Sequence, residues 1–185
     1  MAMRAVPLYR TADDLDDRPD DRNRYEIIDG EVLVTPPPSL GHQRRLRELL
    51  LRLHPFALAR GLEVLFAPLD VRASPVTQVE PDLLVLPLHF EGRGLVRWEP
   101  MSALVLVVEI LSPSTAHVDR GRKRELYLEQ GVPEYWIVDE VSRSVAVWRP
   151  GAGEAQHVRD TLVWTPPGVT ESLDVDLVSL FDDAR

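Results

Sequence analysis

The longest hydrophobic pattern in the chain lies between residues 104 and 139, and it predicts a strand, a crossover helix and a second strand. Residues 104–110 are mostly leucine and valine, which is typical of a strand buried on both faces. A helical pattern follows at about residues 118–130, and residues 135–139 have the composition of the next strand. Such a unit implies two parallel strands joined by a right-handed connection.

The residues before this unit predict a hairpin, a helix and two strands. Residues 25–34 flank Asp29-Gly30, which supplies the positive φ angles of a tight hairpin turn. Leucines at helical spacing predict a helix that begins after Ser39 and ends at Gly61. Residues 62–72 and 79–86 are each predicted to form one strand.

The C-terminal part predicts short strands and a final helical turn. Residues 145–148 and 155–159 are expected to form neighbouring strands, and residues 173–177 a last one. Residues 161–169 are predicted to be a proline-rich loop, and residues 178–181 a short helix.

Length and composition indicate a globular chain without cysteine chemistry. The 185 residues, of which 44% are apolar, are enough for a single domain over residues 1–185 with its own core. The absence of cysteine excludes disulfides, thiolate zinc sites and cysteine nucleophiles. No signal-peptide core and no run near the roughly 20 apolar residues of a membrane helix is present, so we expect a cytoplasmic protein that binds no membrane.

The formal net charge of −9 is unevenly distributed. Residues 11–31 and 171–185 carry net charges of −6 and −4, so the rest of the chain is about neutral, and within it residues 39–60 hold five arginines against one glutamate. This distribution leaves room for a local basic face that meets phosphates. The candidate nucleic-acid contacts are Arg44, Arg45, Arg120 and Arg122. The alternative for such arginines is an ordinary solvated helix face.

Two acids in hydrophobic surroundings are the main chemical signal. Asp82 and Glu109 each lie on a hydrophobic strand or at its end, and they converge if the two strands are neighbours. Two close carboxylates repel unless a cation holds them apart, and oxygen ligands suit Mg²⁺ or Mn²⁺. The backbone carbonyl of Ile110 is a further candidate ligand. Such a site, with a nearby ammonium, fits hydrolysis of a phosphodiester.

Lys123 is the single lysine among twenty arginines, and it lies on the predicted crossover helix. An ammonium is a compact charge that binds a water or a phosphoryl oxygen in places where a guanidinium does not serve. Chance survival of one surface lysine is the alternative. Together, Asp82, Glu109 and Lys123 are the predicted catalytic residues.

Three further residues are candidate accessory groups, each with a plain structural alternative. Glu31 is a third carboxylate or an exposed turn residue, and His42 is a phosphate or carboxylate contact or a structural histidine. Tyr127 lies one helical turn after Lys123, where it either holds the lysine or packs. The sequence contains neither a Gly-x-Ser-x-Gly elbow nor a dinucleotide-binding glycine fingerprint, which disfavours those two enzyme classes.

Six segments carry a resemblance to a known family: Tyr25 to Glu31, Pro36 to His42, Pro81-Asp82-Leu-Leu-Val, Val108 to Thr115, Asp119 to Lys123 with Tyr127, and Gly131 to Asp139. In these segments the chain resembles the Uma-type restriction endonucleases, a bacterial branch of the PD-(D/E)XK nuclease superfamily. The resemblance implies a restriction-endonuclease-like α/β core at about residues 25–140, with a central mixed β-sheet flanked by helices. The N-terminal hairpin and a C-terminal β extension complete the expected fold.

The resemblance also implies that Asp82 and Glu109 are metal ligands in a metal-dependent endonuclease of DNA. The superfamily lysine normally lies two residues after the glutamate, where this chain has Leu111, so Lys123 is expected to be a migrated lysine. One alternative is an inactive module that keeps the fold and binds nucleic acid or protein, and another is a nuclease that acts on RNA or on branched DNA. By analogy with enzymes that treat two DNA strands symmetrically, we expect a homodimer.

Overall fold

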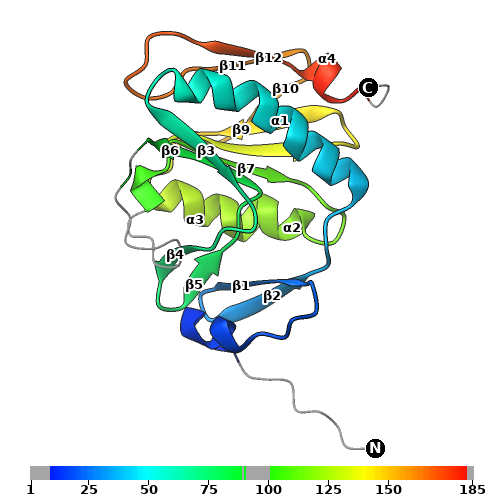
Figure 1. Cartoon of the computed structure of the whole chain (residues 1–185), viewed down its shortest axis with the longest axis vertical. Helices are drawn as coiled ribbons and strands as arrows, with labels where there is room; N and C mark the ends of the chain where they lie inside the picture. The colour runs from blue at the N-terminus through cyan, green and yellow to red at the C-terminus, as the bar shows by residue number, and fades with distance from the viewer. Residues whose placement is uncertain (1–8, 89, 91–100, 183–185) are drawn as a thin grey trace, which may run out of the picture.

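The computed structural model describes residues 9–88, 90 and 101–182, which form stacked layers of sheet and helix (Figure 1). The strands are β1 (Arg24–Ile28), β2 (Glu31–Thr35), β3 (Leu62–Phe66), β4 (Val71–Ser74), β5 (Thr77–Val79), β6 (Leu83–Pro87), β7 (Leu106–Ile110), β8 (Tyr135–Asp139), β9 (Ser144–Trp148), β10 (Gln156–Val158), β11 (Thr161–Trp164) and β12 (Leu173–Asp176). The helical elements are η1 (Ala12–Asp17), α1 (Leu40–Leu58), η2 (Met101–Ala103), α2 (Ala116–Val118), η3 (Asp119–Lys123), α3 (Arg124–Glu129) and α4 (Leu177–Leu180). None of the helices within these ranges has the length and apolarity needed to cross a membrane.

A six-stranded mixed sheet in the order β10-β9-β8-β7-β6-β3 forms the centre of the fold. In the described chain β7 and β8 are parallel, and the other neighbouring strands of this sheet are antiparallel. The consecutive elements α2, η3 and α3 connect β7 to β8, and we call residues 116–129 the crossover helix. The predicted strand–helix–strand unit and the predicted mixed α/β fold are therefore confirmed.

Each face of the central sheet has its own hydrophobic core, because successive side chains of a strand point to opposite faces. Leu83 and Val85 of β6 pack with α1, α4 and the β11–β12 hairpin. Leu84 and Leu86 of the same strand pack instead with the crossover helix and with β4 and β5. Figure 1 shows these two sets of elements on opposite sides of the sheet. The side of the sheet that a residue occupies thus decides which helix it meets.

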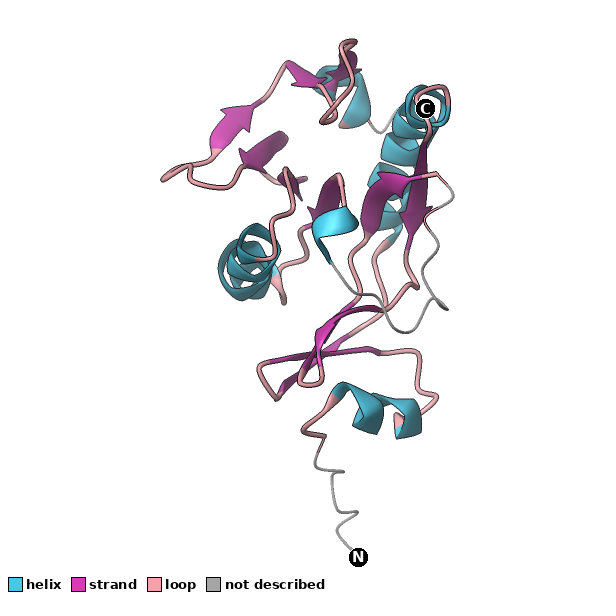
Figure 2. Cartoon of the chain, turned by 90° about the vertical axis from the view of Figure 1, so that its left-hand side faces the viewer, coloured by secondary structure: helices cyan, strands magenta, loops and turns pink. Residues whose placement is uncertain are grey.

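A second sheet, in the order β2-β1-β5-β4, lies beyond the crossover helix (Figure 2). The β1–β2 hairpin matches its prediction, with φ of +51° at Asp29 and +78° at Gly30. Residues 62–72 and 79–86 are each divided between the two sheets, so the prediction of one strand for each was wrong. Pro68 and Pro81 lie at these breaks, and proline cannot donate a ladder hydrogen bond.

The C-terminal extension is an antiparallel hairpin, β11–β12, followed by the short helix α4. The prediction of a loop for residues 161–169 was wrong at its start, because β11 occupies Thr161–Trp164. Leu162 and Trp164 are buried and alternate with exposed neighbours, which is the period of a half-buried strand. The side chain of Asp176 caps α4 by accepting hydrogen bonds from the backbone N–H groups of Val178 and Ser179.

Replacing Leu53 by alanine is expected to lower the free energy of unfolding by about 2–5 kcal/mol, because this side chain is fully buried between α1 and the sheet. The matched control is Leu51→Ala in the same helix, where the side chain is 61% exposed. The control is expected to change the free energy of unfolding by less than about 0.5 kcal/mol. Urea titrations followed by circular dichroism measure both, and equal losses would contradict the buried face assigned to α1.

Candidate active site

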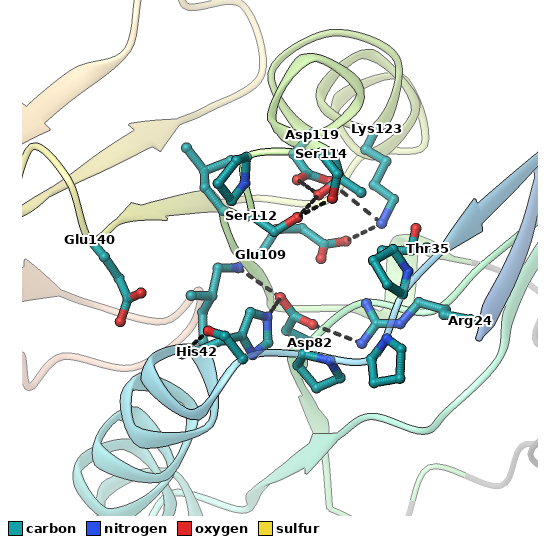
Figure 3. A pocket seen from close by; sticks show the side chains of 18 of the residues that line it. Arg24, Thr35, His42, Asp82, Glu109, Ser112, Ser114, Asp119, Lys123 and Glu140 are labelled. Carbon is teal, nitrogen blue, oxygen red and sulfur yellow. Dashed lines mark hydrogen bonds and ion pairs between the residues drawn. The ribbon is translucent and has the colours of Figure 1, made fainter. Parts of the chain in front are cut away.

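Two carboxylates meet where β6 begins and β7 ends, beside the crossover helix (Figure 3). The strands are antiparallel neighbours with Leu83 opposite Val108, so Asp82, which precedes β6, lies opposite Glu109. Glu109 shares a strand face with Val107, whose side chain packs with the crossover helix. The condition on which the sequence-based site depends, that the two strands are neighbours, is therefore met.

Three donors hold the buried carboxylate of Asp82. Its Oδ2 accepts hydrogen bonds from the backbone N–H of Ile110 at 2.8 Å and from Nε2 of His42 at 2.9 Å. Its Oδ1 pairs with Nη2 of Arg24 at 3.0 Å. Burial alone would raise the pKa of Asp82, but the hydrogen bond from His42 and the charge of Arg24 lower it to about 2. Asp82 is therefore an anion of fixed orientation at neutral pH.

His42 reaches Asp82 because it lies in the first turn of α1. The hydroxyl of Ser39 begins this helix by accepting a hydrogen bond from the backbone N–H of His42 at 3.1 Å. An ionised carboxylate can only accept, so Nε2 of His42 carries the proton that Asp82 receives. Within the described residues the buried Nδ1 has no hydrogen-bond partner. The histidine thus orients the aspartate through one ring nitrogen.

Lys123 is buried, with its side chain 3% exposed, and therefore is not a surface lysine. Its Nζ lies 2.8 Å from Oε1 of Glu26 and 3.0 Å from Oε1 of Glu109. Oδ1 of Asp119 lies 3.6 Å from the same ammonium. The hydroxyl of Tyr127 donates a hydrogen bond to Oε1 of Glu109 at 3.2 Å. Strand β1, strand β7 and the crossover helix each contribute to this cluster.

The crossover helix widens into a π-helical turn at Asp119–Lys123. The hydroxyl of Thr115 donates to Oδ2 of Asp119 at 3.1 Å, and that of Tyr135 donates to the backbone carbonyl of Asp119 at 3.0 Å. Turns of this kind are rare in helices and are frequent at functional sites. Here the turn contains both Asp119 and Lys123, and both side chains are buried.

Burial and an excess of carboxylates over cations shift the pKa values of Glu109 and Lys123. Burial raises the pKa of Glu109 well above its usual range; Lys123 opposes the shift, while Asp82, Asp119 and Glu26 add to it. Burial alone would lower the pKa of Lys123, but Glu109, Glu26 and Asp119 raise it above its ordinary value. Lys123 is therefore a cation at neutral pH, and the excess of carboxylates around it favours the binding of further positive charge.

These side chains line a cavity of about 250 Å³. Its walls also contain hydroxyl groups from the end of β2, the start of α1 and the loop after β7, namely those of Thr35, Ser39, Ser112, Ser114 and Thr115. In the described part of the chain Oε2 of Glu109 accepts no hydrogen bond, and the carboxylate faces the cavity beside Asp82 (Figure 3). One carboxylate oxygen of the site is thus available to a ligand.

The donor set fits a hard divalent cation. Asp82, Glu109 and the carbonyl of Ile110 offer oxygen atoms, which Mg²⁺ and Mn²⁺ prefer. Along a strand, the backbone N–H and carbonyl groups of successive residues point to alternate sides. Leu111 donates its N–H toward β8, whereas Ile110 donates its N–H toward Asp82, and the carbonyl of Ile110 is expected on the same side as its N–H. No group of three or more histidine, aspartate or glutamate side chains in the described ranges is arranged to hold a metal by itself. The residues fit the common magnesium mode of one or two carboxylates completed by water.

Two of the sequence-predicted residues lie together outside the cavity. Glu31, at the β1–β2 turn, has a side chain that is 70% exposed and pairs with Nη1 of Arg122 at 2.8 Å. Nη2 of Arg122 donates to the backbone carbonyl of Ile28. The structure therefore brings His42 and Tyr127 to the carboxylates, but it does not bring Glu31 there.

The other candidate arginines have different surroundings. Arg45 is buried, where Nε pairs with Glu140 at 3.1 Å and Nη1 donates to the carbonyl of Leu180. Arg44 is exposed on α1. Arg120 has a side chain that is 56% exposed and pairs with Asp139 at 2.9 Å. Of these three, Arg44 and Arg120 are accessible to a large ligand.

Sequence reasoning missed Glu26, Asp119 and Arg24 as members of the site. Glu26 carries the same signal as Glu109, because it is an acid within an apolar strand. Asp119 lies one helical turn before Lys123, the spacing at which opposite charges meet. Arg24 had no comparable signal, since its role depends on the hairpin lying against Asp82.

The chain is similar to a crystal structure of "a putative nuclease belonging to DUF820" from Anabaena variabilis ATCC 29413. The TM-score is 0.77 at 22% sequence identity, with 92% of this chain and 97% of that chain covered, so the likeness shows the fold. No curated protein matches the chain. A model of the Uma2 family, described as "Putative restriction endonuclease", matches residues 12–177. This match spans most of the sequence, so the chain belongs to the Uma2 family.

Proposed function

We propose that this protein is a divalent-metal-dependent endonuclease that hydrolyses phosphodiester bonds of DNA. The observation that carries the proposal is the meeting of Asp82 and Glu109 beside the ammonium of Lys123, 3.0 Å from Glu109. The Uma2 family is described as "Putative restriction endonuclease" and the similar Anabaena protein as "a putative nuclease", which supports the reaction class.

The residues suit the charge changes of this reaction. When a water oxygen bonds to phosphorus and the bond to a sugar oxygen breaks, negative charge grows on the phosphoryl oxygens and the leaving oxygen. A bound Mg²⁺ or Mn²⁺ supplies charge neutralisation and a lowered pKa for bound water. Asp82, Glu109 and the carbonyl of Ile110 are the groups that would hold the ion. Lys123, a cation at neutral pH, offsets charge on the phosphoryl oxygens and orients the attacking water.

Three other residues act as positioning residues in this proposal. Arg24 and His42 fix the two oxygens of Asp82, and Tyr127 fixes Oε1 of Glu109. Hydrogen bonds of this kind hold the metal-binding carboxylates in one orientation and raise the affinity for the metal. The migrated lysine also favours catalysis over an inactive module, because the crossover helix supplies the ammonium that position 111 lacks.

Asp82→Asn and Glu109→Gln are each expected to lower the rate of DNA cleavage with Mg²⁺ or Mn²⁺ at least about a hundredfold. A bound metal stabilises the transition state by several kcal/mol, and losing this stabilisation lowers the rate by a factor of this size. Nicking of supercoiled plasmid measures the rate. The matched control is Glu31→Gln, which changes an exposed glutamate outside the cavity and is expected to retain the wild-type rate.

Both substitutions keep the side-chain shape, and circular dichroism checks that each variant folds. Each substitution also removes one charge of a buried ion pair, Arg24–Asp82 or Lys123–Glu109, and is expected to lower the free energy of unfolding by about 3–5 kcal/mol. Cleavage at the wild-type rate by both Asp82→Asn and Glu109→Gln would contradict the proposal. So would the absence of cleavage by the wild-type protein with either metal on duplex, single-stranded and branched DNA.

Metal binding gives a second prediction that does not depend on turnover. Calorimetric titration with Mn²⁺ is expected to show binding to the wild-type chain and to Glu31→Gln, with affinity lowered at least about tenfold in Glu109→Gln because one carboxylate ligand is lost. Wild-type affinity in Glu109→Gln would show that the ion binds elsewhere.

A further inference from the structure

A groove lined by cations lies on the face of the central sheet that carries the crossover helix, beyond the helix itself. Ala146 and Trp148 of β9 line it, and both are partly buried side chains that pack against the core on that face. Arg120 and Arg124 of the crossover helix line one side, and His157 and Arg159 at β10 line the other. The hollow has a volume of about 450 Å³, within the usual range for ligand sites. We call these six residues the basic groove.

The arginines of the groove are only partly engaged inside the molecule. The side chain of Arg159 is exposed and makes no ion pair or hydrogen bond with another described residue. Arg124 lies over the ring of Trp148, at 4.8 Å from its centroid, and pairs with the exposed carboxylate of Glu125. Exposed pairs of this kind are weak and are easily exchanged for an incoming anion.

Asp139, the acid among the lining residues of the groove, is already paired with an arginine. Asp139 pairs with Arg120 through Oδ2, and its Oδ1 accepts hydrogen bonds from the backbone N–H groups of Val141 and Ser142. Its carboxylate therefore orients Arg120 and leaves the other two arginines uncompensated by a lining residue. A net positive groove on a chain of formal charge −9 selects anions at this place.

The groove adjoins the cavity of the candidate active site. Asp119 and Glu140 line that cavity, whereas their chain neighbours Arg120 and Asp139 line the groove. The start of the crossover helix and the end of β8 therefore each contribute neighbouring residues to the two hollows, and Arg120 and Asp139 pair with each other on the groove side.

We propose that the basic groove binds the phosphodiester backbone of the nucleic-acid strand that is cleaved in the adjacent cavity. This inference rests on the proposed nuclease function and adds the place where the substrate is held. Arginine guanidinium groups match phosphate oxygens in geometry, and cations on both sides of a trough suit a strand that passes between them. Backbone contacts position a substrate and read no sequence, so the groove contributes affinity without base preference.

The test is fluorescence anisotropy with short labelled DNA duplexes, single-stranded DNA and RNA, without divalent metal, between about 50 and 200 mM salt. Arg159→Gln and Arg120→Gln are expected to weaken binding equally for unrelated base sequences. Each is expected to lower the slope of log affinity against log salt by about one, the contribution of one phosphate contact. The matched control is Arg47→Gln, at an exposed arginine of α1 on the opposite face of the sheet, which is expected to keep the wild-type slope.

The outcomes separate this inference from the proposed function. Loss of slope in the two groove variants supports the groove whether or not cleavage is found, and comparison of the DNA and RNA probes identifies the preferred strand. Where cleavage occurs, Arg159→Gln is expected to raise KM and leave kcat unchanged. Wild-type slopes in both groove variants, or no binding of any probe by the wild-type protein at the lowest salt, would overturn the inference even if the enzyme cleaves DNA.

Discussion

The burial of a lysine ammonium among carboxylates is the constraint on which the site depends. A charge removed from water is tolerated only where opposite charges and hydrogen bonds replace its hydration. Lys123 meets this requirement through Glu26, Glu109 and Asp119, which belong to a strand of the second sheet, a strand of the central sheet and the crossover helix. The ion pairs that keep the ammonium stable thus also fix how these three elements lie against one another.

The two sheets have distinct parts in building the site. The central sheet brings Asp82 and Glu109 together through the pairing of β6 with β7, and its parallel β7–β8 pair requires a crossover helix on one face. The second sheet adds Arg24 and Glu26 from β1, which reach Asp82 and Lys123. The chain passes between the sheets at Pro81, so the residue next to this break becomes the carboxylate at the junction.

Charge is arranged so that anionic and cationic functions are adjacent but separate. The cavity concentrates carboxylates around one lysine, which suits a divalent cation and repels a bare phosphate in its absence. The arginines of the basic groove, together with the Arg120–Asp139 pair, line a separate hollow outside this cavity. We infer a division of labour in which the groove holds the polyanion and the cavity acts on it once an ion is bound.

Much of the fold follows from the sequence because local patterns dictate it. Asp29-Gly30 specifies the hairpin turn, the apolar run before Glu109 specifies a buried strand, and the parallel pair follows from the strand–helix–strand order. The single lysine and the acids at strand ends also predicted Asp82, Glu109 and Lys123, which the structure places together. These features depend on backbone propensity and on the cost of burying charge, and both can be read locally.

Tertiary structure decided what depends on contacts between distant segments. The sequence does not show that residues 62–72 and 79–86 divide between two sheets. Which sheet each half joins depends on the strands it pairs with, and these are distant in the chain. The sequence also does not distinguish the buried Arg45 from the exposed Arg120, since both are arginines on helices. Nor does it place Arg24 against Asp82, 58 residues away in the chain. Residue type fixes which chemistry is possible, whereas packing decides which charges are desolvated and which partners they meet.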